Sequence, residues 1–122
     1  MAAPNIVNVS SIYGKTMGAA LGTTAGADIL SGAGDKLLKI NSIIVANVDG
    51  SNGADVTVRF YDYNVSTAYH LAKTVLVPAD STLVVLGKDA PIYLEENDRI
   101  QAHASAASDL EIIISYEELD DA

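Results

Sequence analysis

The stretch Ala54-Asp55-Val56-Thr57-Val58-Arg59-Phe60-Tyr61-Asp62 decides the fold class of this chain. Val56, Val58 and Phe60 fall on every second position, and polar or charged side chains fill the positions between them. Successive side chains of a β-strand point to opposite faces, so this period of two predicts a strand with one face turned toward a core.

The same period recurs on both sides of that stretch. Three further sets of alternate residues are each expected to share a face: Ile40, Ser42, Ile44, Ala46 and Val48; Ile100, Ala102 and Ala104; and Leu110, Ile112, Ile114 and Tyr116. Together with the turn residues between them, these runs predict strands at 36–49, 54–62, 68–77, 82–86, 92–94, 99–104 and 110–116. The turn Asp49-Gly50-Ser51-Asn52-Gly53 predicts a hairpin that pairs 36–49 with 54–62.

About eight strands at about ten-residue spacing, without a long amphipathic helix between them, are typical of an antiparallel β-sandwich. We therefore expect one all-β, jelly-roll-like domain that spans residues 1–122. A parallel sheet is excluded because its strands need long crossover connections.

The first third of the chain is less regular. Residues 5–12 predict either a first strand or an extended arm, and the glycine-rich stretch 14–34 predicts two short strands near 16–21 and 27–30 or, alternatively, a short helix. We expect residues 1–34 to include an irregular segment that serves as an extended assembly arm over a neighbouring subunit. At the other end, the acidic stretch 117–122 is expected to be a frayed tail.

Composition restricts the function. The 122 residues contain 16 acidic and 7 basic side chains, a net charge of −9, and no cysteine. Basic residues scattered singly along the sequence argue against nucleic acid, and no apolar run reaches the roughly 20 residues of a membrane helix. The start of the chain lacks the basic and apolar regions of a signal peptide, so we expect a cytoplasmic protein or one of a particle assembled there. The acidity fits either solubility or a docking face for a basic partner.

No pattern predicts chemistry. His70 and His103 lie in predicted strands without a second ligand at metal-binding spacing, and the loop at 49–55 lacks the donor positions of a calcium-binding loop. Glu95 and Glu96 are adjacent, so on a strand they would point to opposite faces. Neither a nucleophile elbow nor a phosphate-binding loop is present. We therefore predict no catalytic, cofactor-binding or metal-binding residue, and no enzyme activity.

Three tyrosines form the candidate interface. Tyr61 and Tyr63 flank Asp62 at the end of one predicted strand, and Tyr69 lies just beyond the loop that follows. Tyrosine offers a large contact area at a small cost in rotamer freedom, so the three predict a contact patch. The alternative is that they cap the rim of the core with their hydroxyl groups in water.

Several stretches resemble a group of small virion structural proteins of tailed bacteriophages, chiefly those of marine and cyanobacterial phages. They are Lys39-Ile40-Asn41-Ser42-Ile43-Ile44-Val45-Ala46-Asn47-Val48-Asp49-Gly50, residues 54–58, residues 77–86, residues 92–100 and residues 109–118. The similarity extends over about 36–118. This chain has Asn97 where such proteins often carry glycine, and asparagine also tolerates a positive φ.

The resemblance implies a β-sandwich that decorates the capsid or builds the neck or tail, as a symmetric oligomer without an active site. On this basis we expect a capsid decoration (cement) protein, a homotrimer bound over the joints between major capsid subunits in the virion. A neck, collar or tail component is the alternative. A receptor- or carbohydrate-binding fibre module comes last, because the chain has no tryptophan to stack on sugars.

Overall fold

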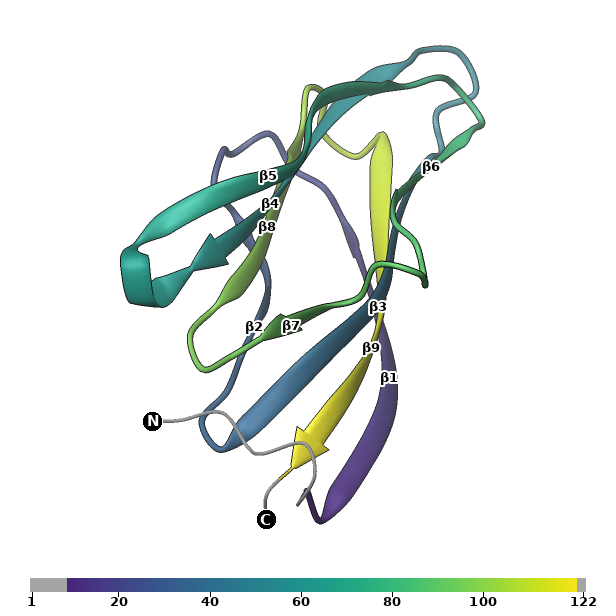
Figure 1. The fold of residues 1–122 in the computed structure, drawn as a ribbon. Helices are drawn as coiled ribbons and strands as arrows, with labels where there is room; N and C mark the ends of the chain where they lie inside the picture. The colour runs from purple at the N-terminus through teal and green to yellow at the C-terminus, as the bar shows by residue number, and fades with distance from the viewer. Residues whose placement is uncertain (1–8, 121–122) are drawn as a thin grey trace.

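The computed structural model describes residues 9–120 and shows two β-sheets packed face to face (Figure 1). The strands are β1 (Ser11–Ala20), β2 (Asp28–Ser31), β3 (Lys36–Asn47), β4 (Ala54–Asp62), β5 (Thr67–Val77), β6 (Thr82–Leu86), β7 (Ile92–Leu94), β8 (Arg99–Ala104) and β9 (Leu110–Asp120). A short 3-10 helix, η1 (Tyr63–Val65), joins β4 to β5. Within residues 9–120, no helix is long and apolar enough to cross a membrane.

All strand pairs are antiparallel, and their order is that of a jelly roll. The first sheet runs β1-β9-β3-β6, with β7 also paired to β3, and the second sheet runs β2-β8-β4-β5. When β6 and β7 are counted as one interrupted strand, the chain forms two four-stranded sheets in jelly-roll order. The predicted all-β sandwich is confirmed.

The predicted hairpin at 49–53 is wrong. β3 belongs to the first sheet and β4 to the second, so this loop crosses between sheets. The buried Asn47 side chain secures the crossing, because its amide nitrogen donates to the backbone oxygens of Asn52, at 3.0 Å, and Val77, at 2.9 Å. Turn residues alone did not distinguish a hairpin from such a crossing.

The predicted inner face of β3 is also wrong beyond its first half. Ile40, Ile43 and Val45 are fully buried, whereas Ser42 and Ile44 are only half-buried. The register against β9 shifts between Ile40 and Ser42, which marks a bulge. One extra residue reverses the alternation, so the side chains after the bulge face the opposite way from the expected one.

Elsewhere the alternation is as expected. Val56 and Val58 of β4, Ile100 of β8, and Ile112 and Ile114 of β9 are fully buried between the sheets. The core therefore consists of β-branched and other aliphatic side chains contributed by both layers.

Both ends of the described chain are built into the sheets. β1 pairs with β9 along ten residues, from Ser11 opposite Asp120 to Ala20 opposite Glu111, and β2 pairs with β8. From Ser11 onward the glycine-rich segment therefore forms two strands and a loop of this sandwich instead of an arm or a helix. The arm expected at residues 1–8 lies outside the described residues, as do residues 121–122. Residues 117–120, expected to be frayed, are the last part of β9.

Candidate interaction surface

An apolar groove opens at the edge of the sandwich, between the β4–β5 hairpin of the second sheet and β7 of the first. It has a volume of about 350 Å³ and is lined by Phe60, Tyr69, Leu71, Ile92 and Tyr93, which we call the tyrosine groove. Tyr69 is 54% exposed and Tyr93 is 42% exposed. The groove thus presents two half-exposed aromatic side chains.

The strand register explains the floor of the groove. Phe60 lies opposite Tyr69 on β5 and opposite the buried Ile100 on β8, so all three share the inner face of the second sheet. The β4–β5 register shifts around Leu71, and such a bulge redirects side chains. Phe60, Leu71 and Ile92 all pack against the core, which makes the groove an open extension of it.

A buried carboxylate fixes the end of the groove. Asp98 is 4% exposed, and its two oxygens accept the backbone N–H groups of Tyr63 and Glu95, each at 3.0 Å. Tyr63 directly follows β4, and Glu95 directly follows β7. Asp98 therefore ties together the two segments that border the groove.

The structure does not bring the three predicted tyrosines together. Only Tyr69 lies in the groove. Tyr61 points to the outer face of the second sheet, where the Arg99 guanidinium lies 5.3 Å from its ring centroid. Tyr63 is 47% exposed on η1. The interface role stays a prediction, and within this groove it concerns Tyr69.

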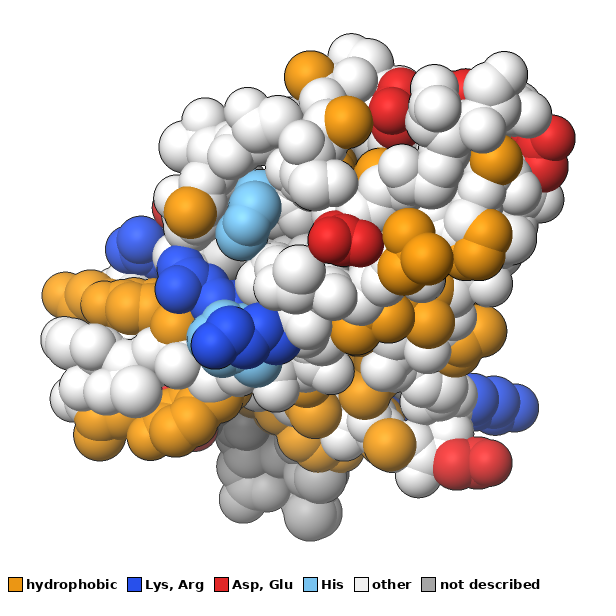
Figure 2. Space-filling model, turned by 90° about the horizontal axis from the view of Figure 1, so that it is seen from above, with side chains coloured by type: hydrophobic (Ala, Val, Ile, Leu, Met, Phe, Trp, Pro, Cys, Tyr) orange, Lys and Arg blue, Asp and Glu red, His pale blue; other side chains and the backbone are white. Residues whose placement is uncertain are grey.

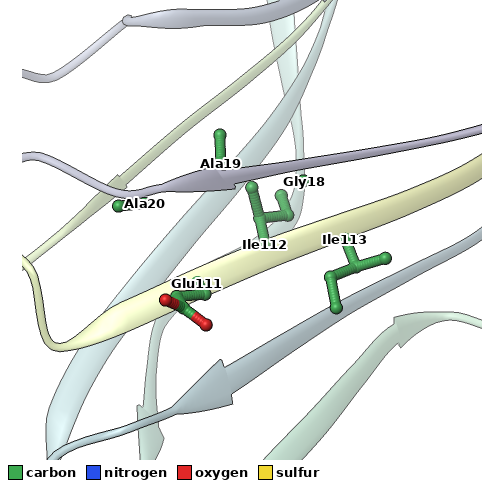
Figure 3. A pocket seen from close by; sticks show the side chains of 6 residues that line it. All are labelled: Gly18, Ala19, Ala20, Glu111, Ile112 and Ile113. Carbon is green, nitrogen blue, oxygen red and sulfur yellow. The ribbon is translucent and has the colours of Figure 1, made fainter.

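A second hollow, of about 360 Å³, lies over β1 and β9 (Figure 3). It exists because Gly18, Ala19 and Ala20 of β1 are small beside the longer side chains of β9, Glu111 and Ile113. One carboxylate and no further polar side chain line it, so it offers shape without a set of polar groups to orient a ligand.

Exposed apolar side chains are not confined to the groove. Among the described residues, the large hydrophobic side chains that stand exposed are Ile12, Tyr13, Val48, Tyr63, Val65, Tyr69, Leu76, Val84, Tyr93 and Ile113. Single exposed residues are ordinary, whereas the tyrosine groove gathers two of them over an apolar floor and is therefore the candidate interaction surface.

The residues considered for chemistry lie apart. His70 and His103 are on β5 and β8, with β4 between them. In the part of the chain that the structure describes, no three His, Cys, Asp or Glu side chains are grouped so that they could hold a metal ion. In the loop considered for calcium, the Asp49 carboxylate accepts the backbone N–H of Ser51 at 2.8 Å, which is a local turn contact.

Comparison with known proteins supports the fold. No family model and no curated protein matches the chain. Among solved structures, the chain is similar to a protein of Bacillus endospore appendages, which are described as a novel family of disulfide-linked pili. The two are 18% identical, with a TM-score of 0.53, over 92% of this chain and 88% of the other. At this identity the likeness concerns the architecture alone.

Sequence reasoning missed four of the five groove residues. Phe60, Leu71, Ile92 and Tyr93 come from three strands and meet only through the sheet order. A signal existed for Phe60, because it ends an alternating run and faces the same way as Tyr69 once β4 and β5 pair. The approach of β7 to this edge could not be read from the sequence.

Proposed function

We propose that this chain is a non-enzymatic structural protein of a tailed-phage virion, and specifically a capsid decoration protein that binds as a trimer over the joints between major capsid subunits. The observation that carries the proposal is the tyrosine groove, with Tyr69 and Tyr93 half-exposed over an apolar floor. Such a surface suits a subunit whose apolar contacts are completed by its neighbours.

The charge of the chain fits the same role. At −9, free copies repel one another out to a screening length of about 8 Å at physiological salt, whereas apolar contacts act only when two surfaces touch. A protein present in many copies benefits from both properties, because it stays soluble before assembly and adheres afterwards.

A filament subunit is the second candidate. It is favoured by the structural likeness to the protein of Bacillus endospore appendages, which are disulfide-linked pili. These 122 residues contain no cysteine, so copies of this chain would have to be joined by non-covalent contacts. A neck or tail position differs from a shell position in copy number rather than in the surface required.

The test is made on purified phage particles. We expect hundreds of copies per particle by quantitative gel staining, and release of the chain from intact heads by salt or heat. About a dozen copies would indicate the neck instead. Recovery of the chain only in a fibre fraction that binds host polysaccharide, or only in a cell-surface filament, would refute capsid decoration.

A matched pair of variants tests the groove itself. Tyr69→Ser with Tyr93→Ser should reduce incorporation by about tenfold, because it removes the exposed aromatic contacts. Tyr13→Ser removes a similarly exposed tyrosine (49%) from β1 and should leave incorporation unchanged. Melting curves confirm that all variants are folded. Equal incorporation of both variants would rule out the groove as the contact surface.

A further inference from the structure

The outer face of the second sheet gathers arginine and histidine side chains that are distant in the sequence. Arg59 of β4 lies in register with His70 of β5 and Gln101 of β8. Arg99 and His103 stand two residues before and after Gln101, so they share its face. Figure 2 shows both histidines of the chain close to Lys and Arg side chains on one side of the molecule. We call Arg59, His70, Arg99 and His103 the cationic face, after its two guanidinium groups.

Hydrogen bonds hold this face in place. Arg59 Nη2 donates to Gln101 Oε1 at 2.6 Å, and Gln101 Nε2 donates to Asp28 Oδ1 at 3.0 Å. Arg99 Nη1 lies 3.4 Å from Asp28 Oδ2. Two guanidinium groups are thus set against the carboxylate of Asp28, and Asp55 stands four residues before Arg59 on the same side of β4, beside the loop at 48–53.

Aspartate side chains gather, without lysine or arginine among them, at one end of the sandwich. Three loops meet there, at 48–53, 78–81 and 105–109. The backbone N–H of Asp80 donates to the oxygen of Asp49 at 3.2 Å, and that of Val48 donates to the oxygen of Asp109 at 2.8 Å. None of the three loops contains a lysine or arginine.

A fourth aspartate joins this end, because the backbone oxygen of Asp55 accepts the N–H of Ser105 at 2.9 Å. The N–H groups of Ser51 and Asn52 donate to the Asp49 carboxylate and lower its pKa below the ordinary 3.8, so Asp49 is ionised at neutral pH. We call this set the acidic end: Asp49, Asp55, Asp80 and Asp109.

We propose that the acidic end of one copy docks on the cationic face of a second copy. A second copy is the occupant because the complement of the cationic face is carried by the same chain. On a chain with a net charge of −9, most other orientations bring acidic side chains together, so this orientation is favoured. The contact joins two different surfaces and is therefore heterologous, and its repetition gives a ring or an open filament.

The cationic face and the tyrosine groove lie on opposite faces of the edge strand β5. β5 carries His70 on the outer face, and Tyr69 and Leu71 in the groove on either side of it. A copy seated on the cationic face therefore does not itself fill the groove, which is left for a contact on the other face of the sheet. The inference rests on the proposed role as an assembly subunit, for which it supplies the orientation of neighbouring copies.

Sedimentation velocity of the purified chain tests the contact at about 0.02 M and about 0.5 M salt, where screening lengths differ by severalfold. We expect association at low salt that is lost at high salt. Arg59→Gln with Arg99→Gln should weaken association by about tenfold or more. So should Asp49→Asn with Asp80→Asn, in which asparagine still tolerates the positive φ of Asp80. The acidic-end variant remains informative if the arginine variant fails to fold.

The matched control is Lys39→Gln with Lys88→Gln, which makes the same change in net charge beside the first sheet and should leave association intact. The proposal would be overturned if the wild-type chain stays monomeric at low salt. It would also be overturned if the control variant weakens association as much as the arginine variant does. Binding of single-stranded DNA to the cationic face without self-association would overturn it too, since the face would then serve an anionic polymer.

Incorporation into particles separates this contact from the proposed function. If the arginine variant enters particles normally, the head-to-tail contact fails while the virion role stands. If the wild-type chain self-associates but is absent from phage particles, the head-to-tail contact stands while the virion role fails.

Discussion

Lys36 Nζ on β3 lies 3.1 Å from Glu118 Oε2 on β9, and from the other side Lys15 Nζ on β1 lies 3.2 Å from Glu118 Oε1. One carboxylate thus joins three neighbouring strands. Burial opposes ionisation of Glu118 and is the largest single influence on it, but the hydrogen bonds and charges of the two lysines together outweigh burial and lower its pKa. The hydrogen bond from Lys36 to Glu118, with the attraction between the two charges, raises the pKa of Lys36.

These shifts predict acid sensitivity. A carboxyl group whose pKa is lowered in the folded state stabilises the fold above its ordinary value, here 4.5, and this contribution is lost as the pH falls through the lowered pKa. Wild-type unfolding free energy should therefore fall more steeply below about pH 4.5 than that of Glu118→Gln. Urea denaturation at several pH values measures the difference, with Glu117→Gln as a charge-matched control. Parallel curves for the wild type and Glu118→Gln would contradict the linkage.

Gly32 stands where a side chain has no room. Its N–H donates to the oxygen of Asp98 at 2.9 Å, and a Cβ atom would collide with the backbone oxygen of Glu95. Gly32→Ala should therefore cost about 2–3 kcal/mol of unfolding free energy, because backbone must move. Gly22→Ala is the control, since nothing lies within 4 Å of its Cβ position. Equal midpoints of chemical denaturation for the two variants would show that the turn yields easily.

Thr74 has a φ of 52°, a left-handed conformation that a β-branched residue adopts at a cost. Its N–H donates to Thr57 Oγ1 at 3.1 Å. Thr74 lies where the register between β4 and β5 shifts, between the pair Val56–Val75 and the pair Val58–Ala72. Thr74→Gly keeps this backbone bond and relieves the strain, so the unfolding free energy should rise by about 0.5–1 kcal/mol. Thr16→Gly, in the regular strand β1, should lower it instead. A destabilised Thr74→Gly variant in thermal melts would mean that the threonine side chain contributes more than the strain costs.

Asp98 links the segments that follow β4 and β7, two of the strands that border the tyrosine groove. Asp98→Ala leaves the N–H groups of Tyr63 and Glu95 without their carboxylate and should cost about 2–3 kcal/mol. Asp62→Ala removes one exposed bond, to the N–H of Asn64, and should cost about 1 kcal/mol or less. Differential scanning calorimetry separates the two outcomes. A smaller loss for Asp98→Ala than for Asp62→Ala would show that Asp98 does not hold the two sides together.

Much of this fold could be predicted from alternation and turn residues. Four predicted strands have the bounds observed: β4, β6, β7 and β8. The errors arose where a local pattern has two physical solutions. Asp49 and its neighbours suit a hairpin or a crossing between sheets, and the bulge after Ile40 leaves no mark in the composition. Gly14 and Gly18 obscured β1, because an edge strand exposed on most of its length needs little apolar alternation.

The candidate surface was less predictable. Tyr69 attracted attention as an aromatic residue near the end of a hairpin, but Tyr61 lies one residue out of phase and faces the other way. Phe60 and Ile92 come from different sheets, so their meeting depends on how the two layers are offset. Likewise Arg59 and Arg99, which look isolated in the chain, become near neighbours only because β4 pairs with β8.

The pairing of Ser11 with Asp120 has a mechanical consequence. A force applied at these two positions would peel β1 from β9 one hydrogen bond after another, since the bonds of an antiparallel pair lie across the strands. Such unzipping resists tension poorly. The proposed role on a pressurised capsid therefore requires contacts over the broad faces of the sandwich rather than attachment at Ser11 and Asp120.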